Sequence, residues 1–307
     1  MRLLTRSDFD GLVCAALLEE AGVVDSHKFI HPKDLQDGKI EVTENDCLAN
    51  VPYAEGCGMW FDHHSSEEER VEFSDIFKRI KGASESSPSC ARVVYNYLND
   101  KDKLSRFEES GLLEAVDKCD SGNLTHEEII KPKGWILLSF VMDPRSGFGH
   151  SGNYRISNLQ LMKDLIQKLR TSNSKDLISD PDLSERLENY YMQQDEYEAM
   201  IRDNSQVSRN VLVINLLKVE QIATGNRFTE YVMFPDQNVS VRIMWGYKKQ
   251  NVVISCGKSI TNRSSEADIG SLMLKFGGGG HKAVGTCQVP VEEWKNSCEE
   301  ILRVLRE

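Results

Sequence analysis

Residues 2–18, RLLTRSDFDGLVCAALL, decide the fold of the amino-terminal half of the chain. The run at residues 2–5 predicts a short buried strand. The run at residues 12–18, followed by two glutamates and then a glycine, predicts a buried helix with a glycine stop. Asp8 and Asp10 therefore lie on a turn between a strand and a helix. Because open α/β sheets bind ligands beyond the carboxyl ends of their strands, this turn is the first candidate site.

Short apolar runs and helical patterns alternate along the next hundred residues. The runs at residues 27–31, 40–44 and 58–61 predict three more strands. Helical patterns at residues 89–98 and 104–118 follow them. This alternation is typical of βαβ units around a largely parallel sheet. We therefore predict an α/β fold in which this half forms the parallel-sheet domain.

Acidic and histidine side chains gather at the ends of these predicted elements. Oxygen-rich ligands with one or two imidazoles suit Mn²⁺, and suit Mg²⁺ less well. Two such ions about 3.5–4 Å apart can activate a water and stabilise the leaving oxygen of a phosphoryl transfer. Taken alone, an Asp-x-Asp turn is more often a helix cap or a solvated loop, and a His-His pair is more often structural. The candidate side chains are Asp8, Asp10, Asp46, Asp62, His63, His64, Asp117 and Asp120.

The remainder of the chain predicts a second α/β domain behind a helical connector. A polar, helical pattern covers residues 158–203, and an alternation of period two begins at residue 211. The predicted strands are 211–214, 231–234, 239–244, 252–254 and 286–289, and the predicted helices are 266–276 and 291–305. We predict a metal-binding catalytic domain at residues 1–155, a helical connector at 156–204, and a smaller α/β domain at 205–307.

The amino-acid composition excludes some classes of binding partner. Lys and Arg total 37 against 48 Asp and Glu, and the net charge of −11 opposes binding to long nucleic acid or to an anionic membrane. The longest apolar runs fall short of the roughly 20 residues that span a bilayer. The 8 cysteines include no C-x-x-C pair and sit among apolar neighbours, which indicates buried free thiols. We expect a cytoplasmic protein.

The order of the motifs resembles the DHH phosphoesterases that carry a DHH-associated carboxy-terminal domain. Within that family, the chain is similar to the bacterial proteins labelled exopolyphosphatase-related or nanoRNase-like. D-x-D-G, N-D, D-H-H and D-x-x-D-S-G carry the resemblance in the first domain, and N-R and G-G-G-G-H carry it in the second. The resemblance implies two Mn²⁺ ions. Their implied ligands are Asp8, Asp10, Asp46, His63, and either Asp117 or Asp120.

The resemblance also implies roles for the remaining motif residues. Asp62 would orient His63 through a hydrogen bond and so determine its tautomer. His64 would contact the scissile phosphate or assist the leaving group. In the second domain, Arg263 would grip a phosphate, and His281 would donate to the substrate. The glycine run would let the backbone approach the substrate closely at Gly278, Gly279 and Gly280, although such a run alone equally fits a flexible helix cap.

Two positions depart from the family pattern. Many members carry a His four residues before the first Asp, and Leu4 stands there in this chain. Arg6 occupies the place where RecJ-type nucleases carry another Asp. One metal is therefore short of a ligand, which leaves open one ion or two, and also a catalytically degenerate protein that binds nucleotides without cutting them.

The expected activity is metal-dependent hydrolysis of a short phosphate compound, with linear dinucleotides or very short oligoribonucleotides cut to mononucleotides. The net charge of −11 provides no basic track for long strands. Removal of a terminal phosphate from 3′-phosphoadenosine 5′-phosphate or from polyphosphate is the alternative, and a cyclic dinucleotide is a further one. We expect no membrane partner, and the sequence leaves monomer and homodimer both open.

Overall fold

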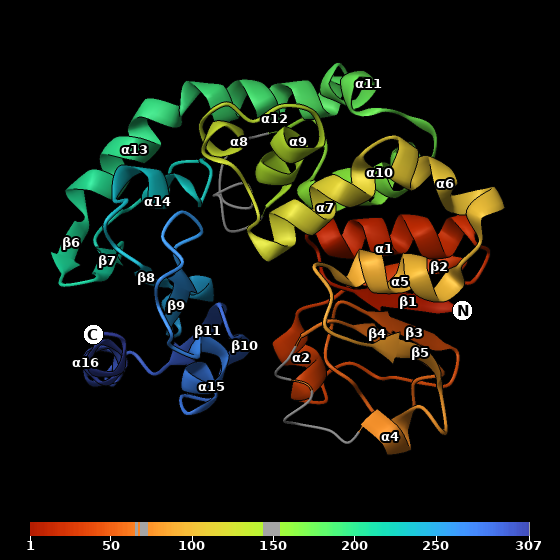
Figure 1. The fold of residues 1–307 in the computed structure, drawn as a ribbon, viewed down its shortest axis with the longest axis horizontal. Helices are drawn as coiled ribbons and strands as arrows, with labels where there is room; N and C mark the ends of the chain where they lie inside the picture. Colours follow the sequence, from red (N-terminus) through yellow and green to blue (C-terminus); the bar gives the residue numbers. More distant parts are fainter. Residues whose placement is uncertain (65–66, 68–72, 144–153, 307) are drawn as a thin grey trace. The chain divides into compact units, whose positions relative to one another are not determined.

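The structure is a computed structural model that describes residues 1–64, 67, 73–143 and 154–306 (Figure 1). The chain divides into two compact units. The first consists of Met1–Leu124 and Pro132–Asn189, and the second of Thr125–Lys131 and Tyr190–Glu307. The boundary at residue 189 falls inside helix α12 (Pro181–Met192), so the predicted connector at 156–204 is shared between the two units.

A five-stranded, all-parallel sheet forms the centre of the first unit, as the alternation of strands and helices predicts. Its strand order is β2-β1-β3-β4-β5, and every neighbouring pair is parallel. The carboxyl ends of all five strands therefore lie at one edge. The strands are β1 (Arg2–Thr5), β2 (Ser26–Phe29), β3 (Asp46–Ala49), β4 (Met59–Asp62) and β5 (Lys81–Ser84).

Helix α1 (Phe9–Glu20) is buried along almost its whole length, as its uninterrupted apolar run predicts. Every residue from Leu12 to Leu18 is fully buried, and α1 contacts α5, α7 and α10. Figure 1 shows α1 and α5 on one side of the sheet, with α2 and α4 on the other. The helices of this unit are α2 (Pro32–Gln36), α4 (Phe73–Ile76), α5 (Cys90–Leu98), α6 (Lys101–Glu109), α7 (Leu112–Ser121), α9 (Gly134–Met142), α10 (Asn158–Thr171) and α11 (Ser174–Ile178).

Two predictions for the first unit are wrong. Residues 40–44 form no strand. Ile40 and Val42 instead pack, half-buried, against the apolar face that includes Leu4, Leu48 and Trp60. The strand begins only at Asp46. The single helix predicted at residues 104–118 is two helices, α6 and α7, separated at Gly111, whose φ of 75° is left-handed.

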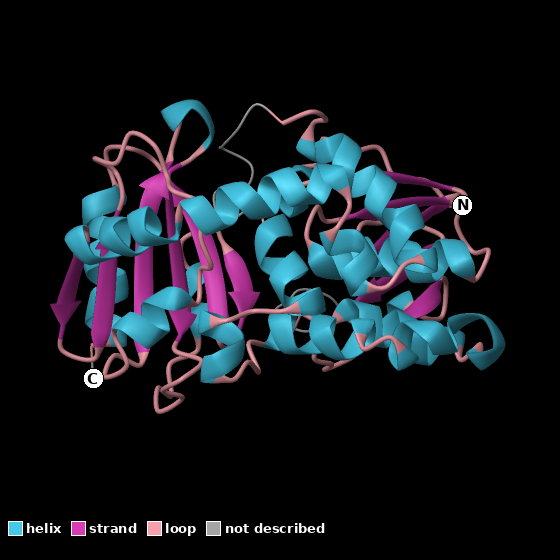
Figure 2. Ribbon diagram, turned by 90° about the horizontal axis from the view of Figure 1, so that it is seen from above, coloured by secondary structure: helices cyan, strands magenta, loops and turns pink. Residues whose placement is uncertain are grey.

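The second unit contains a six-stranded mixed sheet (Figure 2) in the order β10-β11-β9-β8-β7-β6. β7 and β8 run parallel, and the other pairs are antiparallel. The strands are β6 (Ser205–Ser208), β7 (Val211–Asn215), β8 (Val239–Trp245), β9 (Val252–Lys258), β10 (Gly279–His281) and β11 (Val284–Val289). The helices are α8 (His126–Ile130), α13 (Gln194–Asp203), α14 (Thr229–Met233), the 3₁₀ turn η2 (Tyr247–Lys249), α15 (Ile269–Leu274) and α16 (Trp294–Leu305).

The strand predicted at residues 231–234 is wrong, because this stretch belongs to the short helix α14. The helical backbone brings Glu230 to the buried guanidinium of Arg242. It also places the Tyr231 hydroxyl 3.1 Å from the hydroxyl of Ser240. Satisfying a buried ion pair and a buried hydroxyl outweighs the local β-propensity of the segment.

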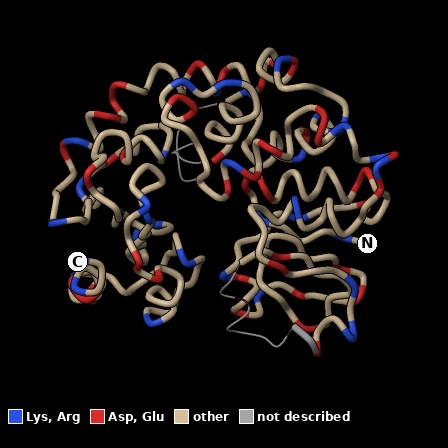
Figure 3. Tube along the Cα trace, in the orientation of Figure 1, with Lys and Arg blue, Asp and Glu red and all other residues tan. Residues whose placement is uncertain are grey.

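All eight cysteines are free and buried, as predicted. None of the described helices has the length and apolar character that crossing a membrane requires. Lys and Arg positions are interspersed with Asp and Glu positions in both units (Figure 3).

Candidate active site

The strand-to-helix turn after β1 presents two carboxylates at the carboxyl edge of the parallel sheet. Asp8 is the N-cap of α1, and its Oδ1 accepts a hydrogen bond from the backbone N–H of Gly11 at 3.0 Å. Asp10 lies in the first turn of the same helix and is almost completely buried. A carboxylate at an N-cap satisfies a helix N–H that would otherwise lack a partner, which explains why this sequence begins a helix here.

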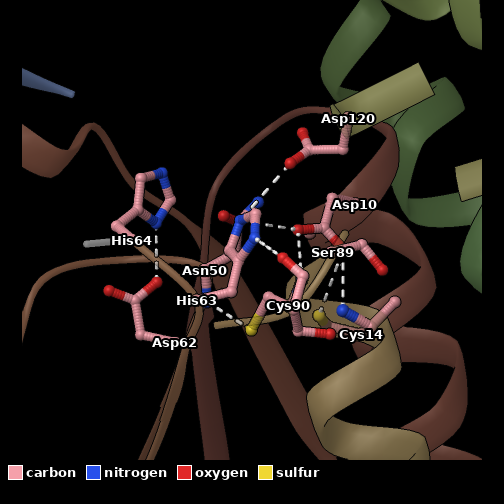
Figure 4. A network of polar contacts seen from close by, with 12 residues as sticks. Asp10, Cys14, Asn50, Asp62, His63, His64, Ser89, Cys90 and Asp120 are labelled. Atoms are coloured by element: carbon pink, nitrogen blue, oxygen red, sulfur yellow. Dashed lines mark hydrogen bonds and ion pairs between the residues drawn. The ribbon is translucent and has the colours of Figure 1, made fainter. Parts of the chain in front are cut away.

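Asp10, His63 and Asp120 form a compact cluster of potential metal ligands (Figure 4). The His63 Nε2 atom lies 3.6 Å from Asp10 Oδ2 and 3.3 Å from Asp120 Oδ2. The three donor atoms all lie within 4.8 Å of one another. They come from α1, from the segment after β4, and from the last turn of α7, so residues far apart in the sequence meet at one point.

The carboxylate of Asp10 is anchored by the amino-terminus of helix α5. The backbone N–H groups of Cys90 and Ala91 donate to Asp10 Oδ2 and Oδ1 at 2.9 and 2.8 Å. The Cys14 thiol lies 3.9 Å from Oδ1. Burial, and secondly the negative charge of Asp120, nevertheless raise the pKa of Asp10 to about 8. The site therefore concentrates negative charge that a cation would relieve.

The ring of His63 is oriented by a backbone carbonyl. Its Nδ1 lies 3.2 Å from the carbonyl oxygen of Ser87. When Nδ1–H donates to that oxygen, Nε2 of the neutral ring carries the lone pair and faces the two carboxylates. Burial acts to lower the pKa of His63, but Asp120 and Asp10 outweigh it, and the pKa is raised. The two carboxylates therefore favour positive charge at this position.

Asp62 and His64 form a second polar pair beside the cluster. The Nδ1 atom of His64 is 2.7 Å from Asp62 Oδ1, and Asp62 is completely buried at the end of β4. The family resemblance implies that Asp62 orients His63. In the structure Asp62 instead contacts His64, and the partner of His63 is the carbonyl oxygen of Ser87. A buried carboxylate of this kind orients an imidazole.

The structure does not bring Asp46 to the cluster. Because strand β3 starts at Asp46 and pairs in parallel with β1, Asp46 lies opposite Arg2, at the amino edge of the sheet. Arg2 Nε and Nη2 donate to its two oxygens at 2.6 and 3.0 Å. Burial alone would raise the pKa of Asp46, but these bonds and those from Thr43 lower it. Asp46, which was predicted to be a metal ligand, therefore forms a structural ion pair with Arg2.

Asn50 occupies the carboxyl end of β3, the position at which the sequence analysis expected Asp46. It is buried, and its Nδ2 donates to Asp8 Oδ1 at 3.0 Å. The signal that could have found it is the one used elsewhere, namely a polar residue directly after an apolar strand. The mistaken strand at residues 40–44 placed that signal too early in the chain.

Of the two acidic candidates on α7, the structure brings Asp120 to the cluster and engages Asp117 elsewhere. Ser89 Oγ donates to Asp117 Oδ1 at 2.7 Å. Arg92 Nε and Nη2 both donate to Asp117 Oδ2, at 2.9 and 2.7 Å. Ser89 is the N-cap of α5, so this clamp joins α7 to the helix whose amino-terminus holds Asp10. Sequence reasoning missed both Ser89 and Arg92.

The candidate substrate residues of the second unit lie on its sheet and an adjoining loop. Arg263 is exposed, and its Nε donates to the carbonyl of Ile260 at 3.3 Å. Gly279, Gly280 and His281 form the edge strand β10. A Cβ atom on Gly278 would lie 2.2 Å from Thr286 O, and one on Gly280 would lie 2.2 Å from Val284 O. Glycine is therefore required at these two positions by the approach of β11.

Neither the protein-family models nor the curated proteins contain a match to this sequence. Among solved structures, the chain is similar to the pGpG-specific phosphodiesterase PggH of Vibrio cholerae. The two share 40% identity over 98% of this chain and 97% of that one, with a TM-score of 0.76.

The chain belongs to the DHH phosphoesterase family. Its fold is also similar to that of a DHH domain from a protein described as a member of a family of ribosomal proteins. That match has 12% identity, a TM-score of 0.54, and coverage of 99% of this chain and 86% of the other. The protein is accordingly a hydrolase that acts on phosphoester bonds.

The cluster of this DHH phosphoesterase suits a divalent cation. Two carboxylates and one imidazole nitrogen converge within 4.8 Å, and Mn²⁺ and Mg²⁺ favour such oxygen-rich donor sets. Burial, and secondly the nearby carboxylate of Asp120, raise the pKa of Asp10, so its ionised form is unfavourable without a cation. Asp10, His63 and Asp120 are the residues that would hold the ion.

Proposed function

We propose that the protein is a Mn²⁺-dependent phosphodiesterase that hydrolyses linear dinucleotides, pGpG first among them, to mononucleotides. The observation that carries this proposal is the 40% identity to a pGpG-specific phosphodiesterase along almost the full length of both chains. The Asp10–His63–Asp120 cluster supports it, because it supplies the donor set that metal-dependent phosphoester hydrolysis requires.

A bound divalent cation supplies two things to this chemistry, a lowered pKa for an attacking water and neutralisation of charge on the phosphate. The water oxygen forms a bond to phosphorus, and the bond from phosphorus to the 3′ oxygen of the first nucleoside breaks. One proton from water reaches that 3′ oxygen, and two mononucleotides result.

We assign the proton transfer to His64. Its Nδ1 lies 2.7 Å from the buried carboxylate of Asp62, which orients the ring. His64 then gives a proton from Nε2 to the leaving 3′ oxygen. We assign substrate binding to the second unit, where Arg263 offers a fork of donors that matches a phosphate and His281 offers a further donor.

The test is hydrolysis by the purified protein, with Mn²⁺ and after chelation, of a panel of phosphate compounds. The panel contains pGpG, pApA, a five-nucleotide RNA, a cyclic dinucleotide, 3′-phosphoadenosine 5′-phosphate and polyphosphate. We expect the linear dinucleotides to be cut fastest, and chelator to abolish the reaction.

Two variants make the panel specific to the site. His63→Gln removes a cluster ligand, and His126→Gln changes an exposed histidine at the start of α8 as the matched control. Loss of activity in the first variant alone supports the proposal. If another compound of the panel is cleaved fastest, that compound replaces pGpG as the assigned substrate. If the protein binds nucleotides but cleaves no compound of the panel, it is a nucleotide-binding protein and the proposed enzymatic activity is wrong.

A further inference from the structure

The carboxylate of Asp8 is fully engaged by donors from the protein itself. Its Oδ1 accepts from Gly11 N–H and from Asn50 Nδ2, both at 3.0 Å. Its Oδ2 lies 3.1 Å from Arg6 Nε. A carboxylate surrounded by three N–H donors is already neutralised, so it offers little to a metal ion. Asp8 therefore differs from Asp10, although only one residue separates them.

Leu4 and Asn50, two described residues near Asp8, provide no charged ligand on this side of the turn. Leu4, at the position where many relatives carry a His, is completely buried in the apolar core between the sheet and α2. Asn50 presents an amide N–H to Asp8, and an amide carries no negative charge. Among the described residues on this side of the turn, Asp8 is consequently the one anionic ligand available to a second cation, which does not fit the two-ion arrangement that the resemblance implies.

The side chain of Arg6 already places a positive charge beside Asp8. The guanidinium of Arg6 pairs with Asp8, and its side chain is 37% exposed. Within the described part of the chain, Asp8 is the only carboxylate that forms an ion pair with Arg6. Arg6 directly follows β1, at the carboxyl edge of the sheet, two residues before Asp8 and four before Asp10. A guanidinium keeps its charge at all physiological pH values and can bind a phosphate through two parallel hydrogen bonds.

We propose that this enzyme works with one divalent cation, held by Asp10, His63 and Asp120, and that Arg6 replaces the second. Arg6 binds a phosphate oxygen of the substrate and supplies the charge that a second ion would supply. Asp8, which itself accepts a hydrogen bond from Asn50, holds Arg6 in place. This inference deepens the proposed function and rests on it for the identity of the substrate, but not for the number of ions.

The first test counts ions without measuring activity. Metal-free protein is titrated with Mn²⁺, and bound ion is measured by equilibrium dialysis and by electron paramagnetic resonance. We expect one ion per chain, with the spectrum of an isolated Mn²⁺. The His63→Gln variant should lose it. Two tightly bound ions with a spin-coupled spectrum in the wild type would overturn the inference.

A gain-of-site variant sharpens the count. Asn50→Asp combined with Arg6→Ala restores a carboxylate and removes the resident cation, so a second ion should bind and the coupled spectrum should appear. Asn50→Asp alone should bind the second ion more weakly, because Arg6 stays beside Asp8. Equal second-site affinity in the two variants would show that Arg6 does not occupy the cation position, and would contradict the inference.

The second test asks whether Arg6 binds phosphate. Affinity for GMP is measured by calorimetry on metal-free protein in chelator, so that no metal contributes. Arg6→Ala should weaken GMP binding by about tenfold to a hundredfold, the loss expected of charge-assisted hydrogen bonds. Arg6→Lys should restore part of it. Arg79→Ala, which removes an exposed arginine of the same unit, is the matched control and should bind GMP normally.

The outcomes separate this inference from the proposed function. If pGpG is cleaved but the wild type binds two ions, or if Arg6→Ala binds GMP like the wild type, the inference fails and the function stands. If one ion binds and GMP affinity depends on Arg6, but another compound is the substrate, the inference stands and the substrate assignment fails.

Discussion

The two edges of the parallel sheet in the first unit use the same side chain for opposite purposes. At the amino edge, Asp46 is closed by two hydrogen bonds from Arg2, and its pKa is lowered. At the carboxyl edge, Asp10 faces His63 and Asp120, and its pKa is raised to about 8. A cationic partner thus marks a structural carboxylate, and an unbalanced acidic cluster marks a carboxylate reserved for a cation.

The largest expected effect concerns Asp120 at the carboxyl edge. Asp120→Asn removes a ligand and a repulsive charge together. We expect hydrolysis to fall by about a thousandfold or more, as for loss of an essential catalytic group. The metal-free protein should unfold at an equal or higher temperature, because the substitution removes one of the charges that raise the pKa of Asp10. A marked loss of thermal stability would assign Asp120 a structural role instead.

The second prediction uses pH to compare proton and metal at Asp10. Its folded pKa of about 8 exceeds its ordinary value of 3.8. Between those values the folded state holds a proton that the unfolded state does not, so the stability of the metal-free protein should fall as pH rises. Mn²⁺ must displace that proton, so its affinity should rise by up to about tenfold per pH unit between pH 6 and pH 8.

Two titrations check this prediction. Mn²⁺ affinity is measured by calorimetry at pH 6, 7 and 8, and unfolding of the metal-free protein is followed in urea at the same pH values. Asp120→Asn serves as the comparison, since it removes one cause of the raised pKa. Mn²⁺ affinity that does not change with pH would contradict a protonated Asp10.

The third prediction places Asp117 with the structural carboxylates. Asp117→Asn leaves Arg92 and Ser89 without their partner, and should lower the free energy of unfolding by about 2 kcal/mol. Because the clamp only positions α7, Mn²⁺ should still bind, and kcat should fall by roughly tenfold, with KM little changed. Loss of Mn²⁺ binding equal to that of Asp120→Asn would show that Asp117 is a ligand.

The smallest effect is expected at the amino edge. Asp46→Asn should lower the free energy of unfolding by about 1–2 kcal/mol at neutral pH, while activity and Mn²⁺ affinity stay unchanged. Since the pKa of Asp46 is lowered on folding, its stabilising contribution is present above its ordinary pKa and is lost as pH falls. The difference from the wild type in urea unfolding should therefore shrink towards pH 3. A change in Mn²⁺ binding would contradict the comparison of the two edges.

Much of the architecture follows from local patterns that a single sequence displays. The uninterrupted apolar run after Asp10 predicts a helix buried on all sides, and α1 is one. Strand β1 has the predicted bounds. Among the elements that were missed, the edge strand β6 is short and polar, and its residues Ser205–Ser208 are paired on one side only. Such strands depend on the neighbour that pairs with them and leave little pattern of their own.

The site shows the same division between local and tertiary information. Residue type and motif order identified Asp8, Asp10, His63 and the pair on α7 as candidates, because carboxylates and imidazoles carry their chemistry with them. Which of two aspartates one turn apart faces the cluster depends on Arg92, which lies 25 residues from Asp117. That contact exists only after α5 and α7 have packed together.

The sequence by itself determined the alternation of elements, the family, and the kind of chemistry, since each depends on residue types and their spacing. Only the tertiary structure decided the function of each carboxylate. The register of β3 beside β1 brings Asp46 to Arg2 and Asn50 to Asp8. Whether a carboxylate becomes a metal ligand or a partner in a structural ion pair depends on the charges that packing brings within a few ångströms. Those charges come from distant parts of the chain.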